Sequence, residues 1–176
     1  NEVNDFKETF SLMVLDQLLL SGPNSSFYDS LIRPNISSGY TSNTGYNMAT
    51  IQGSFTIGLN NVKTGDAQDI RRRINSTLDS IMKNGFKRER VEGVLHQFEI
   101  DQKHRSGTFG LNLLFRMLSL VTHKVYEPSP LIVLNIDDLI LDIKKKVLGT
   151  DDEAPTDPKH FENLVKKYLI DNQHKV

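Results

Sequence analysis

The chain has 176 residues, of which 38% are hydrophobic and 24% are charged, proportions that are ordinary for a globular protein. A formal net charge of −1 argues against nucleic-acid and membrane-surface partners, and the lack of cysteine excludes disulfides and thiolate chemistry. No apolar run approaches the roughly 18 residues that span a bilayer. We expect residues 1–176 to form a single domain or a domain fragment, excised from a longer protein because the chain does not begin with Met.

The first 32 residues predict two helices. Asp5 followed by Glu8 resembles a capping box, and apolar residues then recur at helical spacing, which predicts an amphipathic helix over residues 5–20. The segment SGPN at 21–24 ends this helix, because Gly favours helix ends and Pro cannot continue a helix. A second, short helix is expected over 25–32.

Residues 37–59 predict two antiparallel strands. The segment IQGSFTIGLN, which begins at Ile51, alternates apolar and polar residues with the period of a half-buried strand. The segment SSGYTSNTGY, at 37–46, is a more polar strand of the kind found at a sheet edge. We expect the turn between the two strands near Asn47 or Met48.

The rest of the chain predicts helices. We expect these over 66–84, 87–104, 108–123 and 135–148, with the third apolar nearly all round and therefore buried. An acidic linker follows at 149–157, and Asp157 is expected to cap a last helix that has Pro158 at its first position. Two strands alone do not make a stable sheet. The predicted fold class is therefore α+β, a two-layer sandwich whose antiparallel sheet is covered by helices and lacks a strand at each end.

The stretch LHQFEI, at 95–100, resembles part of a zinc motif. His96 and Glu99 share one helical face, as in the inverted zinc-peptidase signature His-x-x-Glu-His, but Ile100 stands where the second His belongs. Glu92 and Lys103 lie on the same face, which is the pattern of a solvated surface. A site in which Glu92, His96 and Glu99 together bind zinc is the alternative. We favour the solvated surface, so that the residues alone predict neither a catalytic nor a metal site.

Four stretches together resemble a known family. They are LLLSGPNSSFYDSLI, TGYNMATIQGSFTIGLNNV, GFKRERVEGVLHQFEIDQKHRSGTFGLNLLF and KKYLIDNQHKV, in this order. They are similar to the presequence proteases, the mitochondrial and plastid branch of the pitrilysin zinc peptidases. The resemblance covers residues 5–148 and 158–176.

The resemblance implies a domain without catalytic chemistry. Members of this family are built as two half-shells of two related domains each, which close around a peptide chamber, and the first domain carries the zinc motif. This chain resembles the second domain, which repeats the pitrilysin and mitochondrial-processing-peptidase type of fold without the metal. It is therefore expected to hold no cofactor and to be inactive by itself, while zinc sits in the first domain of the longer protein.

The resemblance also implies partners and a location. The expected partners are the other domains of the same polypeptide and peptide substrates, with no nucleic acid and no membrane. The longer protein would degrade mitochondrial presequences and other short unstructured peptides in the mitochondrial matrix. The rival is a scaffold domain of a non-peptidase homologue, like the core subunits of a respiratory complex.

Relatives hold the end of a substrate by adding it to an edge strand of the second domain, in which backbone groups give affinity. The alternative to a substrate-holding surface at the matching positions of this chain is that Gly22 and Pro23 merely end a helix and that Gly45 marks a bulge. The resemblance further implies that strands before Asp5 and after NQHKV complete the sheet, so that free strand edges could drive self-association. The positions that match the substrate-holding surface are Ser21, Gly22, Pro23, Tyr40, Thr41, Ser42 and Asn43.

Overall fold

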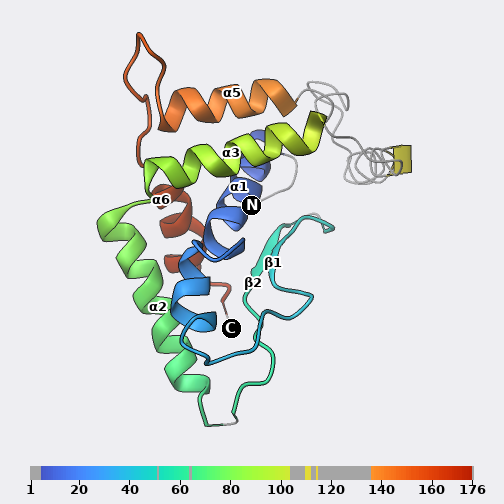
Figure 1. The fold of residues 1–176 in the computed structure, drawn as a ribbon, viewed down its shortest axis with the longest axis vertical. Coiled ribbons are helices and arrows are strands. Elements are labelled where there is room, and N and C mark those ends of the chain that lie inside the picture. The colour runs from blue at the N-terminus through green and yellow to red at the C-terminus, as the bar shows by residue number, and fades with distance from the viewer. Residues whose placement is uncertain are drawn as a thin grey trace.

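The fold is known from a computed structural model, which describes residues 5–50, 52–63, 65–103, 110–111, 114 and 136–175. It combines helices with a small antiparallel sheet, so the predicted α+β class is confirmed (Figure 1). The α-helices are α1 (Phe6–Leu20), α2 (Ala67–Asn84), α3 (Arg88–Lys103), α5 (Ile136–Val147) and α6 (His160–Val165). The other elements are the π-helical segments η1 (Tyr28–Ile32) and η3 (Lys166–Ile170) and the strands β1 (Gly45–Asn47) and β2 (Ser54–Thr56).

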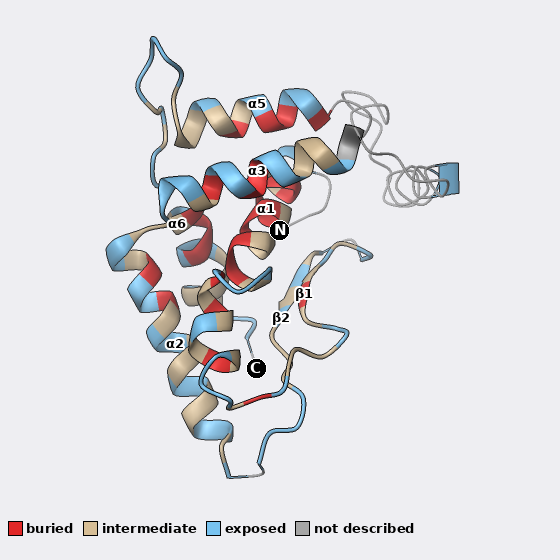
Figure 2. Ribbon diagram, in the orientation of Figure 1, coloured by how far each residue is buried: buried red, intermediate tan, exposed pale blue. Residues whose placement is uncertain are grey.

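Helix α1 lies at the centre of the packing. It contacts α3, α5, α6 and β1, and α3 runs beside α5 in Figure 1. Lys7 is exposed, and every other residue of α1 is buried or half-buried, which makes it the reddest helix in Figure 2. The sequence predicted an amphipathic helix with one buried face. In the structure α1 is covered on nearly all sides, because β1, α3, α5 and α6 all pack on it.

The ends of the helices follow from local signals. The Asp5 carboxylate accepts the Glu8 N–H at 2.9 Å, which caps α1 as predicted. Gly85, with φ +69°, ends α2 in a conformation that suits glycine. Helices α2, α3 and α5 lie within two residues of their predicted bounds. Phe98 of α3 packs edge-on against Phe10 of α1, with ring centroids 5.4 Å apart.

The last helix begins later than predicted. Helix α6 starts at His160, not at Pro158, because the backbone of Asp157 forms other hydrogen bonds instead of capping a helix at Pro158. The Asp157 N–H donates to the carbonyl oxygen of Lys146 at 2.8 Å, and its own carbonyl accepts the His160 N–H at 3.1 Å. The acidic segment 149–157 is therefore a loop that returns to the end of α5, seen as the projecting orange loop in Figure 1.

The hairpin is shorter than predicted. Tyr46 pairs with Phe55 and Asn47 with Ser54, so the connection between the strands begins at Met48, one of the two expected positions, and the second strand begins at Ser54. The first strand is also interrupted. The Thr44 N–H donates to the Thr41 carbonyl at 3.1 Å, which closes a turn over 41–44 within the predicted strand.

A threonine side chain explains the interruption. The Thr44 hydroxyl donates to the Gly58 carbonyl at 2.9 Å and accepts the Gly58 N–H at 3.0 Å, so it replaces a backbone partner in the ladder. Pairing resumes at an isolated bridge between Tyr40 and Leu59. Strand alternation alone does not reveal such a substitution, because Thr is also a favourable strand residue.

The hairpin is tied to α1 by one carboxylate. Asp16 Oδ1 accepts the Tyr46 N–H at 2.9 Å, which satisfies a backbone donor of β1 from the helix side. Gly45, with φ +120°, allows this approach, since a Cβ there would lie 2.9 Å from Asp16 Oδ1. The close contact between helix and strand therefore depends on glycine at this position.

One burial prediction is wrong. Of the helix expected over 108–123, the structure describes Gly110, Leu111 and Leu114 as helical; the rest lies outside the described residues. Leu111 and Leu114 are 53% and 59% exposed rather than buried. An all-round apolar helix is buried only where another element covers it, and none of the described elements covers these two side chains.

Gly45→Ala tests the contact between α1 and β1. The added methyl group would meet a carboxylate oxygen already engaged with Tyr46, and the backbone at φ +120° disfavours any L-residue. We expect the free energy of unfolding, measured by urea denaturation, to fall by about 1–3 kcal/mol. Gly93→Ala in α3 is the control: nothing lies within 4 Å of its Cβ position, so it should be neutral or stabilising. Equal effects of the two substitutions would contradict this account.

Asp16→Asn tests the electrostatic part of the same contact. Burial raises the pKa of the Asp16 carboxyl, and the hydrogen bond from Tyr46 opposes that rise. The folded state therefore keeps the proton to higher pH than the unfolded chain does. The contribution of this carboxyl to the free energy of unfolding falls as pH rises from its unfolded to its folded pKa. Asn keeps the acceptor without the charge. We expect the unfolding free energy of the variant to rise relative to that of the natural protein as pH increases above about 4, the ordinary pKa of Asp. A difference that shrinks with rising pH would contradict this.

Candidate functional site

The stretch LHQFEI lies on α3 and takes part in a contact between helices. His96 Nδ1 is 3.3 Å from Glu99 Oε2, and Glu99 Oε1 accepts a short hydrogen bond from Lys144 of α5. Lys144 holds the pKa of Glu99 below its ordinary value, against a smaller opposing effect of burial. Glu99 thus joins α3 to α5, a role that the sequence pattern did not reveal because Lys144 is distant in the chain.

The third member of the possible zinc set, Glu92, forms an ion pair of its own. Glu92 pairs with Arg88 at 2.8 Å on the same helix. Within the part of the chain that the structure describes, no three His, Cys, Asp or Glu side chains gather as a metal site would require. Nor is any of the described helices both long and apolar enough to cross a membrane.

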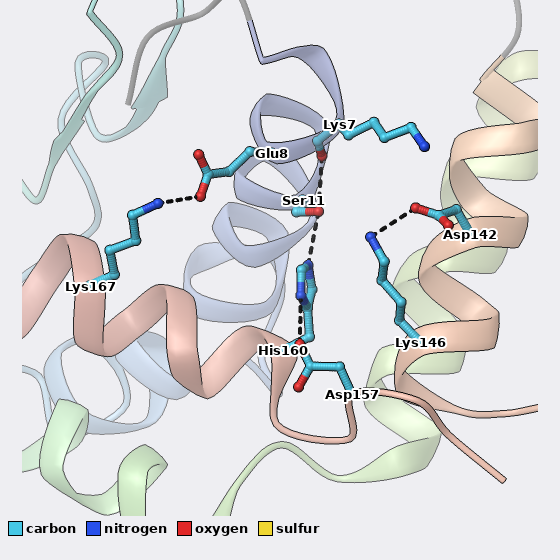
Figure 3. Close-up of polar contacts among 8 residues, drawn as sticks. All are labelled: Lys7, Glu8, Ser11, Asp142, Lys146, Asp157, His160 and Lys167. Atoms are coloured by element: carbon cyan, nitrogen blue, oxygen red, sulfur yellow. Dashed lines mark hydrogen bonds and ion pairs between the residues drawn. The ribbon is translucent and has the colours of Figure 1, made fainter.

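A Ser–His–Asp arrangement joins α1 to α6. His160 Nε2 lies 3.0 Å from the Ser11 hydroxyl, and Nδ1 lies 3.2 Å from Asp157 Oδ2, as Figure 3 shows. The order of the groups is that of a catalytic triad, which the sequence did not suggest because Ser11 and His160 stand 149 positions apart.

The hydrogen bonds indicate that this arrangement has a structural and not a catalytic role. Ser11 is 2% exposed, and its hydroxyl donates to the Lys7 carbonyl at 3.0 Å, so its proton is not directed at the imidazole. The nitrogens of His160 therefore lie beside two oxygens, Ser11 Oγ and the Asp157 carboxylate. A triad needs the opposite polarity, with the hydroxyl donating to the base.

The turn that follows α1 is the first part of the candidate surface. Ser21, Gly22, Pro23 and Asn24 are all exposed, and Gly22 adopts φ +75°, which a tight turn after a helix requires. Ser25 closes the turn: its N–H and its hydroxyl both donate to the Gly22 carbonyl, at 3.2 and 2.9 Å. Ser25 is buried and was not among the predicted site residues, although a hydroxyl three residues after a helix-ending Gly is a usable signal.

The second part is the segment from Tyr40 to Asn43, which is not the continuous edge strand that we expected. Tyr40 forms the isolated bridge, Thr41 donates its N–H to the Gly58 carbonyl at 3.0 Å, and Ser42 and Asn43 are exposed in the turn that Thr44 closes. The backbone of this segment therefore bends away from the sheet after a single paired position.

Tyr40 brings the two parts together. Its hydroxyl is buried and lies beside the Ser25 side chain, with Tyr28 also near. Burial raises the pKa of Tyr40 to about 12, against a smaller opposing effect of Ser25. The Tyr40 hydroxyl, enclosed by the protein, therefore links the segment at 40–43 to Ser25, the residue that closes the turn after α1.

Ser11→Ala tests the tie between α1 and α6. The substitution removes the acceptor for His160 Nε2, and we expect unfolding by urea to require about 1 kcal/mol less. Ser30→Ala is a matched control, because Ser30 also donates to carbonyls of its own helical segment but contacts no histidine, and it should change stability by less than about 0.5 kcal/mol. Covalent labelling of Ser11 by a fluorophosphonate would contradict the structural reading of this cluster.

Comparison with known proteins adds an independent line of evidence. A family model described as the peptidase M16 inactive domain matches residues 1–98. The mitochondrial presequence protease of Danio rerio is 34% identical over 175 residues, which is 99% of this chain and 16% of that protein. The protein of the same name from Xenopus laevis is 34% identical over 176 residues, covering 100% of this chain and 16% of the relative.

The similarity extends to fungi. The mitochondrial presequence protease of Schizosaccharomyces pombe is 31% identical over 173 residues, which is 98% of this chain and again 16% of the relative. The chain thus spans about a sixth of the length of the curated relatives it matches. Because the family model covers more than half of the chain, the chain belongs to the M16 peptidase family, and the part that matches is the domain which that family's description calls inactive.

Proposed function

We propose that this chain is the second, non-catalytic domain of a presequence-protease-like zinc metalloendopeptidase. The similarity to presequence proteases along nearly the whole chain supports this, together with the match to an inactive M16 domain. The zinc and the general base would belong to the first domain of the longer protein, where zinc would supply the activation of water for peptide hydrolysis. The names of the relatives also support a mitochondrial location and favour a peptidase over a respiratory-complex scaffold. Within the mitochondrion we propose the matrix.

In this proposal the domain forms part of the wall of a closed peptide chamber. Its partners are the other domains of the same polypeptide and the enclosed peptides, which would be presequences and other short unstructured chains. Residues 1–176 would act as one unit of that wall, with the loop at 149–157 as its acidic linker. A two-layer sandwich completed by a further strand at each end fits the finding that the two described strands pair only with each other.

The observation that supports a peptide surface here is that the Tyr40 hydroxyl lies beside Ser25, which links two segments whose turn residues are exposed. An extended peptide binds a protein edge through backbone donors and acceptors that the fold leaves free. The Ser42 N–H has no acceptor among the described residues, and Ser42 and Asn43 project into solvent. The peptide would lie across residues 21–23 and 40–43, contacting this edge without entering a continuous sheet.

A free strand edge can also pair with a strand of another segment or of a second copy of the chain. The outer edge of β1 is closed at Tyr46 by Asp16, whereas β2 shows no such closure among the described residues. Pairing of β2 with a strand of another segment or of a second copy is the expected result when the fragment is isolated.

Ser42→Pro in the longer protein tests the peptide surface. Ser42 is the second residue of the turn over 41–44, a position that tolerates proline, so the change removes one N–H while the turn can remain. We expect the Kd of a fluorescent unstructured peptide, measured by anisotropy, to rise by about threefold to tenfold, the loss of one hydrogen bond.

The control is Asp151→Pro, in the exposed loop after α5, which should leave the Kd unchanged. Unchanged binding in Ser42→Pro, with the fold intact by circular dichroism, would remove the support for a peptide surface at this edge.

A further inference from the structure

Two arginines fix the carbonyl groups of the turn after α1. Arg90, from α3, uses one nitrogen, Nη2, to donate to the Gln17 carbonyl at 2.9 Å and also to the Ser21 carbonyl. Arg33 donates from its own Nη2 to the Pro23 carbonyl at 2.8 Å. The backbone is thus held on both sides of Gly22 by charged donors.

The carbonyl between them is held as well. The Gly22 carbonyl accepts the two hydrogen bonds from Ser25, so the three successive carbonyls of Ser21, Gly22 and Pro23 all have protein donors. An exposed turn usually leaves such groups to water and moves among several conformations. Here the conformation is fixed although Ser21, Gly22 and Pro23 are exposed.

Arg90 reaches the end of α1 from α3, a separate helix, and donates to two carbonyls there. Its guanidinium lies at the C-terminal end of α1, where the helix dipole favours a positive charge. The contact has a cost: burial lowers the pKa of Arg90, and the buried Nε has no acceptor among the described residues. A partly desolvated cation with one unsatisfied N–H is a poor choice for stability alone.

We propose that Arg90 is a positioning residue for peptide binding, which acts by holding the Ser21–Pro23 turn in its binding conformation. This inference rests on the proposed peptide surface. A turn that is already fixed loses little conformational freedom when a peptide binds, so more of the interaction energy appears as affinity. Arg90 itself contacts the turn through the Ser21 carbonyl and leaves the backbone N–H of Gly22 in that turn to the peptide.

Substitutions of Arg90 in the longer protein test the inference. Arg90→Met keeps the length of the side chain but removes the donors, and we expect the peptide Kd and the KM to rise about tenfold while kcat stays within about twofold. Arg90→Lys keeps the charge at the end of α1 but donates from a single ammonium, so an intermediate rise of about threefold is expected.

Arg88→Met is the matched control. Arg88 lies two residues earlier on α3 and also donates to a carbonyl after a helix, that of Leu148, at 3.0 Å. The Arg88→Met variant should lose about as much stability as Arg90→Met, without a change in Kd or KM. If Arg90→Met does not fold, the Arg90→Lys variant and its intermediate Kd carry the test.

The outcomes separate the inference from the function on which it rests. An increase in Kd for Ser42→Pro together with wild-type Kd for both Arg90 variants would overturn the role of Arg90 and leave the peptide surface in place. Wild-type Kd for all of these variants would overturn both. A fall in kcat at unchanged KM, in Arg90→Met and Arg88→Met alike, would show a merely structural role and overturn the inference.

Discussion

The enclosure of α1 is the constraint on which the rest of the described structure depends. A helix that is buried on nearly every side must find a partner for each polar side chain inside it, because an unpaired buried polar group is costly. Ser11 finds His160 and Asp16 finds Tyr46, so each polar residue fixes a neighbouring element against the helix. The apolar residues of α1 supply the bulk of the packing, and these few polar contacts decide how α6 and β1 are aligned on it.

The same helix positions the candidate peptide surface. Its C-terminal end leads directly into the exposed turn, and Arg90 fixes that end against α3. Asp16, one turn of helix earlier, holds β1 and therefore the segment that precedes it, including Tyr40. The two turns that we assign to peptide binding are thus both attached to the last two turns of α1. A peptide on this surface would rest on α1, a helix that is buried on nearly every side, rather than on loops alone.

The helices could be predicted from sequence because their signals are local. Periodic apolar residues, Asp5 and Gly85 gave α1 and α2 close to their observed bounds. The interrupted strand could not be predicted, because the hydroxyl of Thr44 replaces a backbone partner only once Gly58 is beside it. The site residues at 21–23 and 40–43 came from a resemblance to a family, and the position of Tyr40 beside Ser25 depends on tertiary packing. Arg90 was missed for the same reason, since an arginine in a helical pattern looks like an ordinary solvated residue.

Hydrogen–deuterium exchange of the longer protein, with and without an unstructured peptide, tests the central claim most directly. The peptidase would be kept inactive with a chelator, so that bound peptide is not consumed. The account predicts slower exchange on binding at the amides of Gly22, Asn24, Ser42 and Asn43, which have no acceptors among the described residues, and no change along the exposed face of α2. Protection confined to other parts of the protein, with the amides at 21–24 and 40–43 unchanged, would contradict a peptide-holding role for this domain.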